Sequence, residues 1–245
     1  MTAAYFDQFN IVSLITIRAP FLGDFAVSFT NSSLMMLSVI TVFWLLFKGE
    51  KIIPTRWQLI MELMHSAIRT MIRDNLGKEG AKYFPFVLCL FIFIVLLNVF
   101  GLFPYVFTPT VHIIVTFGLS LSILIGVTII GLFKFRANFM SLFVPGGAPL
   151  ALAPFLVLIE TISYLSRAIS LGVRLAANLS AGHLLFAILS GFTFDMLTNG
   201  LALLSVFPML IMIFITLLEM AVAVIQAYVF CLLTTIYLGD TVALH

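Results

Sequence analysis

The feature that most constrains the fold of this chain is a series of apolar runs that carry almost no charge. Between Phe139 and Gly239, charged or histidine side chains occur at six positions only: Glu160, Arg167, Arg174, His183, Asp195 and Glu219. Charged residues make up 9% of the 245-residue chain, against about a quarter of a typical soluble domain. We therefore predict an integral membrane protein. Its backbone groups must be satisfied within helices, because no segment alternates like a barrel strand.

The net charge of +2 and the absence of a basic run give no indication of nucleic-acid binding. The two cysteines, Cys89 and Cys231, lie in apolar runs and show no CxxC pattern. We predict that both are buried small hydrophobic residues rather than partners in a disulfide or ligands of a metal.

Hydrophobic patterning predicts a first membrane helix over residues 29–47, which ends at a charged stretch. The segment 54–76 differs, because its apolar residues recur at helical spacing while charged residues fall between them. This pattern predicts an amphipathic helix that lies on the membrane surface. Two further membrane helices, at about 84–104 and 111–133, form a helical hairpin within residues 84–134.

Two unusually long apolar segments follow, at about 155–190 and 201–239. At 1.5 Å per residue each helix is roughly 50–60 Å long, well beyond a hydrocarbon core of about 30 Å. We predict that both are strongly tilted and pack as an antiparallel hairpin within residues 150–240. The expected fold is all-α: five membrane helices plus one surface helix in a single membrane domain over 1–245, with residues 1–50 as its N-terminal segment and first span.

The basic residues predict the orientation. Two connections are rich in Lys and Arg: the one that includes the surface helix and the one with Lys134 and Arg136. The loops 104–111 and 191–200 contain neither residue. By the positive-inside rule, the surface helix and the C-terminus face the cytoplasmic or matrix side.

Charged groups at bilayer depth are costly and indicate function. Glu160, Arg167 and Arg174 are spaced seven apart, so successive members drift only about 20° around a helix and all three share one face. Asn178 stays near that face, whereas His183 points roughly opposite.

On the last helix, Glu219 and Gln226 are also seven apart and share a face. An antiparallel turn centred near residue 196 allows Glu219 to meet either His183 or Arg174. A carboxylate and an imidazole joined through water can relay protons. The plainer alternatives are an Arg174–Glu219 salt bridge that only pins two helices, and a snorkelling role for Arg167.

Four stretches carry a resemblance to a known family: "NVFGLFPYVFTPT" (98–110), "PGGAPLALAPFLVLIETIS" (145–163), "SLGVRLAANLSAGHLL" (170–185) and "LEMAVAVIQAYVFCLLTTIYLGD" (218–240). Their order and spacing resemble subunit a of the F-type ATP synthase from Pro85 to the C-terminus. The resemblance implies a stator subunit beside a rotating ring of subunit c, together with a peripheral stalk containing subunit b and other Fo subunits.

The resemblance also implies roles for individual residues. Arg174 matches the essential arginine that faces the ring carboxylates, and His183 and Glu219 match the pair that lines the outer proton half-channel. Glu160 matches the carboxylate of the inner half-channel. Further polar positions assigned to the proton path are Asn178, Gln226, Asp240, Arg167 and Ser170.

We expect no cofactor and no metal, since His183 and Glu219 alone make a weak metal site. A haem would need axial histidines that face one another across helices, and the two candidates, His112 and His183, end in different environments. No Gly-rich phosphate loop is present, so any ATP chemistry belongs to other subunits of an H⁺-transporting complex. The histidine placement favours the mitochondrial inner membrane over a bacterial plasma membrane. A stand-alone proton channel or secondary transporter remains the alternative function.

Overall fold

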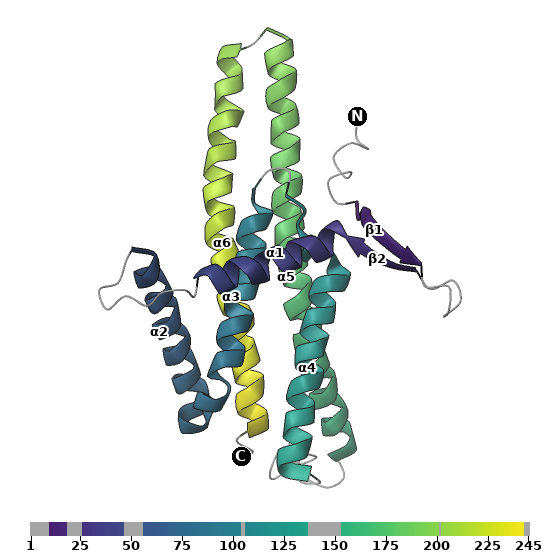
Figure 1. The fold of residues 1–245 in the computed structure, drawn as a ribbon, viewed down its shortest axis with the longest axis vertical. Coiled ribbons are helices and arrows are strands. Elements are labelled where there is room, and N and C mark those ends of the chain that lie inside the picture. The colour runs from purple at the N-terminus through teal and green to yellow at the C-terminus, as the bar shows by residue number, and fades with distance from the viewer. Residues whose placement is uncertain are drawn as a thin grey trace. The chain divides into compact units, whose positions relative to one another are not determined.

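The computed structural model describes residues 10–18, 26–46, 56–103, 106–136, 153–200 and 202–242. Its elements in chain order are β1 (Ser13–Arg18), β2 (Ala26–Thr30), α1 (Asn31–Leu46), α2 (Arg56–Leu76), a 3₁₀ helix (Gly77–Lys82), α3 (Phe84–Gly101), a 3₁₀ turn (Pro109–Val111), α4 (Ile113–Phe135), α5 (Ala153–Thr198) and α6 (Ala202–Val242) (Figure 1). The predominantly helical fold is confirmed.

The predicted long apolar segments are two unbroken helices, α5 with 46 residues and α6 with 41. Four described helices are long and apolar enough to cross a membrane: α3, α4, α5 and α6. The helix α1, which was also predicted to span the membrane, is apolar but shorter: its 16 residues extend over about 24 Å, somewhat less than a hydrocarbon core of about 30 Å. The loop of residues 137–152 and the first two residues of the predicted surface helix lie outside the described residues.

One element departs from the all-α prediction. β1 and β2 pair antiparallel as a two-stranded sheet, with Ile15 opposite Phe29 and Thr16 opposite Ser28 (Figure 1). β-Branched residues favour extended backbone, and strand pairing satisfies each partner's peptide groups. Neither strand alternates strictly between apolar and polar residues, because Leu14 is followed by Ile15 and Ala26 by Val27, so the pattern that predicts a sheet is missing.

The chain forms two compact units, and α3, α5 and α6 contribute to both. The first contains the described residues of Met1–Lys48, Phe93–His112 and Leu175–Gln226. In this unit α5 and α6 run side by side and antiparallel from a tight turn (Figure 1). Gly200 makes that turn with φ of +78°, a left-handed conformation that glycine adopts without strain and that commonly ends a helix.

The second unit contains the described residues of Gly49–Ile92, Ile113–Arg174 and Ala227–His245. Here α4 packs closely on α5, since the Ser120 hydroxyl donates to the Ala168 carbonyl. A Cβ on Gly172 would lie 3.0 Å from the backbone of Phe117. Small residues at such points let helices approach in lipid, where hydrophobic association is absent.

The two cysteines differ in environment. Cys231 is buried in the second unit, where its thiol lies 3.9 Å from the Val87 carbonyl oxygen. Cys89 is exposed, so the prediction that both are buried is wrong for Cys89. An apolar run predicts membrane depth, but it does not tell which side of a helix faces its neighbours.

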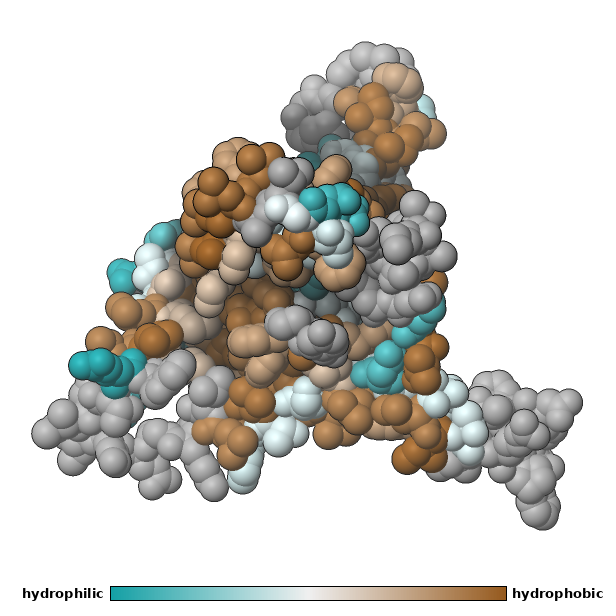
Figure 2. All heavy atoms as spheres, turned by 90° about the horizontal axis from the view of Figure 1, so that it is seen from above, coloured by the Kyte–Doolittle hydropathy of each residue, from teal (hydrophilic) through white to brown (hydrophobic). Residues whose placement is uncertain are grey.

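Among the described residues, hydrophobic (brown) side chains are more extensive than hydrophilic (teal) ones in the view of Figure 2. On the long helices Leu203 is 90% exposed and Phe207 is 70% exposed. Such a surface is stable when the surrounding medium is lipid and costly in water. The exposure pattern therefore agrees with the membrane class that composition predicts.

Candidate functional site

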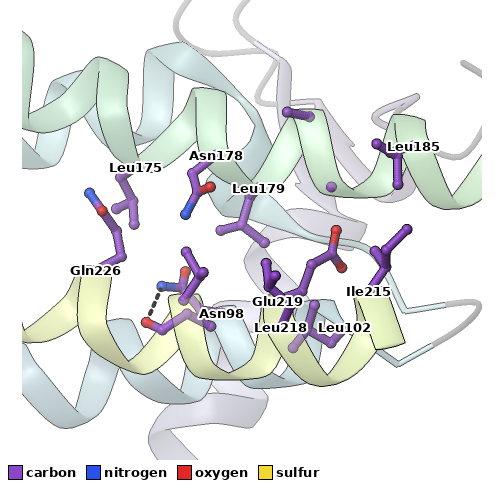
Figure 3. Close-up of a pocket in the computed structure, with 14 residues that line it drawn as sticks. Asn98, Leu102, Leu175, Asn178, Leu179, Leu185, Ile215, Leu218, Glu219 and Gln226 are labelled. Atoms are coloured by element: carbon purple, nitrogen blue, oxygen red, sulfur yellow. Dashed lines mark hydrogen bonds between the residues drawn. The ribbon is translucent and has the colours of Figure 1, made fainter. Parts of the chain in front are cut away.

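A cavity of about 240 Å³ lies within the first unit, between α5, α6 and the end of α3 (Figure 3). Most of its wall is apolar, made by side chains such as Leu179, Leu185 and Ile215. Four polar side chains interrupt this wall: Asn98, Asn178, Glu219 and Gln226. Polar groups that converge in an apolar pocket mark a candidate site.

One face of α6 supplies both polar residues of that helix. Glu219, Val222 and Gln226 follow at intervals of three and four residues, and all three line the cavity. The predicted shared face of Glu219 and Gln226 is therefore confirmed by their common cavity. Seven residues of helix separate the two groups by about 10 Å along the axis.

The Glu219 carboxylate packs directly against α5. Its Oε1 is buried and has no hydrogen-bond partner among the described residues. An ideal Cβ at Gly182 would collide with this oxygen, so glycine at that position leaves the space that the carboxylate occupies. A buried polar atom without a partner costs about 1–3 kcal/mol, which indicates a functional reason for keeping it.

Sequence reasoning missed Asn98. It is 1% exposed, and its Nδ2 donates to the Ala223 carbonyl oxygen on α6 at 3.4 Å (Figure 3). Its Oδ1 has no partner within the described chain. The available signal was a single amide side chain in the otherwise apolar stretch "FPFVLCLFIFIVLLNVFG" of α3.

Two further amides lie toward one end of the cavity, on facing helices (Figure 3). Gln226 is 8% exposed, and in the part of the chain that the structure describes its Nε2 makes no hydrogen bond. Asn178 lines the same cavity from α5. Together with Asn98, these side chains place several donors and acceptors in the same cavity as the Glu219 carboxylate, an arrangement suited to holding water.

His183 does not line this cavity. Its half-buried imidazole instead meets the Thr108 hydroxyl, with Nε2 and Oγ1 3.3 Å apart. Thr108 is 4% exposed and was missed by sequence reasoning, although it lies in one of the stretches that carry the family resemblance. The segment that follows α3 thus orients His183. In the sequence, His183 comes directly after Gly182, the glycine against which Glu219 packs.

The turn between α5 and α6 explains which residue meets Glu219. The sequence predicted a turn over 191–200, centred near 196, but α5 continues to Thr198 and α6 begins at Ala202. The centre of the turn therefore lies near residue 200. Residues that are compatible with a helix continue to Thr198, and Asn199 and Gly200 then form the turn. This later turn sets Glu219 opposite Gly182 on α5.

The second unit holds the other charged candidates on α5. Arg174 is exposed, and its Nη2 donates to the Ser170 hydroxyl at 3.4 Å, one helical turn earlier. Glu160 is half-buried on the same helix. Because α5 is continuous from Ala153 to Thr198, the seven-residue spacing of Glu160, Arg167 and Arg174 does place them along one face.

Arg167 has partners that the sequence did not reveal. Its Nη1 lies 4.0 Å from Oδ2 of Asp240 near the end of α6, and its Nη2 donates to the Ser163 hydroxyl at 3.4 Å. Both charged side chains are partly exposed, with relative exposures of 43% and 47%. This pair links two helices within the second unit and gives Arg167 a structural contact besides any role in proton movement.

The comparison with known proteins decides the family. The family model "ATP synthase A chain" matches residues 29–239. The chain is 62% identical over 245 residues to ATP synthase subunit a of Metridium senile, covering 100% of both chains. It belongs to the ATP synthase subunit a family. The chain is also 44% identical over 245 residues to ATP synthase subunit a of Emericella nidulans, with 98% of this chain and 96% of the relative covered. It is 44% identical over 243 residues to that of Rhodospirillum rubrum, with 98% of each chain covered.

For a subunit a chain, the structure sorts the predicted residues into groups. Glu219, Asn178 and Gln226 share one cavity, which Asn98 completes. His183 follows Gly182, which lines that cavity, but its own side chain forms a hydrogen bond with Thr108. Within the described residues, no three His, Cys, Asp or Glu side chains gather in a way that could hold a metal ion.

Proposed function

We propose that this chain is the proton-translocating stator subunit of a rotary F-type ATP synthase. Its two offset half-channels load and unload protons on the carboxylates of a ring of subunit c. The observation that carries the proposal is the Glu219 carboxylate, which has an unpartnered oxygen and lies in an apolar cavity that three amide side chains also line. Membership of the ATP synthase subunit a family supports it.

In the outer half-channel, a proton passes by way of His183 and Glu219. The cavity offers a continuation from Glu219 past Asn98 and Asn178 to Gln226. The amides cannot carry a net proton at neutral pH, but they can orient water between ionisable groups. The proton then neutralises a ring carboxylate, and the neutral ring site can enter lipid at a lower desolvation cost.

Arg174 separates the two half-channels. A guanidinium keeps its proton throughout the physiological range, so it attracts an ionised carboxylate and does not relay a proton past itself. After rotation, the ring site releases its proton toward Glu160 on the inner side, while Arg174 stabilises the anion. The hydroxyl of Ser170 holds the guanidinium at 3.4 Å, which gives Ser170 a positioning role.

The energy comes from the membrane potential. Each charge that crosses 100 mV supplies about 2.3 kcal/mol, so several protons must be combined for one ATP. A ring geared to a separate catalytic head achieves this sum. The remaining Fo subunits and a peripheral stalk with subunit b hold this chain against rotation.

We further propose that α1 is the first of five membrane helices and that α2 lies on the inner surface. The assembly resides in the mitochondrial inner membrane. Charge placement and the near-continuous apolar surface of α5 and α6 support a multi-pass arrangement of this kind.

The test is Arg174→Gln in the assembled complex in sealed vesicles, with ATP-driven proton pumping and passive proton leak measured separately. We expect pumping to vanish while the complex still assembles, and leak to rise because the two half-channels are no longer separated. Arg56→Gln, an exposed arginine on α2, is the matched control and leaves both readouts unchanged. Near-normal pumping by Arg174→Gln would contradict the proposal.

A stand-alone proton channel or transporter is the alternative function. It predicts proton conduction by the isolated chain in vesicles, without a ring partner. Conduction of that kind, at a rate that the ring does not change, would favour the alternative.

A further inference from the structure

A second cavity, of about 780 Å³, lies in the second unit beside α2. It is lined by three basic side chains, His65, Arg69 and Arg73, and by no acidic one. The remaining wall is apolar or small, with Ile72 and Phe84 among its members. Nothing in the proposed proton path uses this cavity.

The basic side chains share one stripe of α2. His65, Arg69 and Arg73 are successive i, i+4 neighbours on this helix, so their side chains lie on the same side. The His65 ring packs edge-on against Phe84 at the start of α3, with ring centroids 4.6 Å apart. This contact fixes one side of the cavity.

The end of α2 closes the other side. Gly77 adopts φ of +60°, which ends the helix and turns the chain into the 3₁₀ helix Gly77–Lys82. That 3₁₀ helix packs tightly on α2, because a Cβ at Gly80 would lie 2.7 Å from Cγ2 of Ile72. Ile72 itself is 3% exposed. The cavity is therefore framed by close packing and not by a loose loop.

Within the described part of the chain, neither Arg69 nor Arg73 forms an ion pair, although Glu62 and Asp74 lie on the same helix. The two ion pairs found there are Glu79 with Lys134 and Arg167 with Asp240, and neither uses Arg69 or Arg73. Glu62, on the same helix, accepts a hydrogen bond from Gln58 at 3.3 Å. Two exposed guanidiniums that face one cavity therefore favour an anion with several oxygens.

The surroundings favour a lipid over a free anion. Leu59, Ile60 and Leu63 are 49%, 47% and 61% exposed on α2. By helix geometry, Leu59 and Leu63 lie on the side of α2 that follows the basic stripe, away from the buried face. A headgroup phosphate in the cavity thus leaves acyl chains an apolar surface to cover.

We propose that this cavity binds the phosphate headgroup of an anionic phospholipid from the inner leaflet. Basic pockets on the cytoplasmic or matrix side attract such headgroups, and the Lys and Arg distribution places α2 on that side. The bound lipid anchors α2 at the membrane surface. The inference requires a membrane-embedded chain, but it does not depend on the proton path.

The test uses the intact complex in lipid nanodiscs with two photoactivatable probes, a phosphatidylglycerol and a phosphatidylcholine. Labelled peptides are mapped by mass spectrometry. We expect the anionic probe to label residues 56–92 several-fold more than the choline probe. The double variant Arg69→Gln/Arg73→Gln should lose that excess, whereas Arg56→Gln, an arginine of α2 outside the cavity, should keep it.

Two further arms make the result decisive even where the double variant assembles poorly. Arg69→Lys/Arg73→Lys keeps the charge but loses the fork geometry, and we expect it to retain part of the excess. Unlabelled phosphatidylglycerol added to the wild-type complex should compete with the probe, and inorganic phosphate should not.

Equal labelling by both probes would overturn the proposal in favour of a nonspecific lipid annulus. Displacement by inorganic phosphate would overturn it in favour of a free-anion site. Cross-links from this segment to another subunit, in place of lipid, would show that a protein occupies the cavity. None of these readouts measures proton transport, so they test the lipid site independently of the proposed function.

Discussion

The two cavities of this chain hold polar side chains in opposite ways. The cavity beside Glu219 has apolar walls, and buried oxygen and nitrogen atoms that lack partners in the described chain. The cavity beside α2 is larger. Its polar side chains are all exposed and all basic: two arginines and one histidine. The first suits transient protons and water, and the second suits a lasting counter-ion.

The cost of a charge in each environment explains which polar groups each cavity contains. At membrane depth a fixed charge is expensive, so neutral amides around one carboxylate form a less costly polar path. At the membrane surface, guanidiniums reach both water and headgroups, and their charge costs little. The following variants test whether the two cavities are as different as their chemistry indicates.

The largest effect is expected from Gly182→Ala. The added methyl group would occupy the place of the Glu219 Oε1 atom, so the carboxylate must leave its position. The glutamate side chain is flexible, so the change costs the fold little, but misplacing a reacting group by about 1 Å can slow a reaction about 100-fold. We expect proton pumping by the assembled complex to fall at least about tenfold, measured by quenching of a pH-sensitive dye in vesicles.

Gly126→Ala is the matched control, because a Cβ at that helical glycine has nothing within 4 Å. It should leave pumping unchanged. If Gly182→Ala pumps as well as Gly126→Ala, the close packing of Glu219 on α5 does not matter for proton movement. Lipid labelling of the α2 cavity should be unaffected by either change.

A smaller effect is expected from Asn98→Leu. Leucine has a similar volume, and it removes both the weak hydrogen bond to Ala223 and the unpartnered Oδ1. Replacing an incompletely bonded polar group with an apolar one of the same shape is often neutral for stability. We expect pumping to slow several-fold while the thermal inactivation temperature of the complex stays the same or rises.

The reverse pattern in Asn98→Leu, a lower inactivation temperature with normal pumping, would assign Asn98 a purely structural role. Asn98→Gln keeps the amide and serves as the companion variant. Partial recovery of pumping in Asn98→Gln would tie the effect to the amide group.

The smallest effect is expected at the frame of the α2 cavity. The Lys134 ammonium, 2.5 Å from Glu79 Oε2, holds the pKa of the Glu79 carboxyl below its usual value by a hydrogen bond and by charge attraction. A lowered pKa in the folded state stabilises the fold above the carboxyl's unfolded pKa. The stabilisation fades as the pH falls through the lowered value.

Glu79 is 61% exposed, so water and salt screen this pair. Glu79→Gln should change thermal stability at pH 7 only slightly, and high salt or acid pH should remove the difference from wild type. Melting curves at neutral and acid pH, with and without salt, measure this. A large, salt-independent loss would mean that the pair is much less solvated than its exposure indicates.

The sequence determined the class and the helices of this protein. Apolar runs without charge leave helices in a membrane as the stable solution, and the length of 155–190 and 201–239 already predicted the two long helices α5 and α6. The regular spacing of Glu160, Arg167 and Arg174, and of Glu219 and Gln226, also followed from helix periodicity alone.

Which side chains contact one another depends on how the helices pack. A four-residue difference in the centre of one turn set Glu219 against Gly182, because in an antiparallel pair each residue of error in the turn moves every facing residue. Asn98 and Thr108 entered the site from a third segment, and Asp240 met Arg167 from the far end of α6. Periodicity describes the faces of one helix, but which faces meet depends on packing between segments that are distant in sequence.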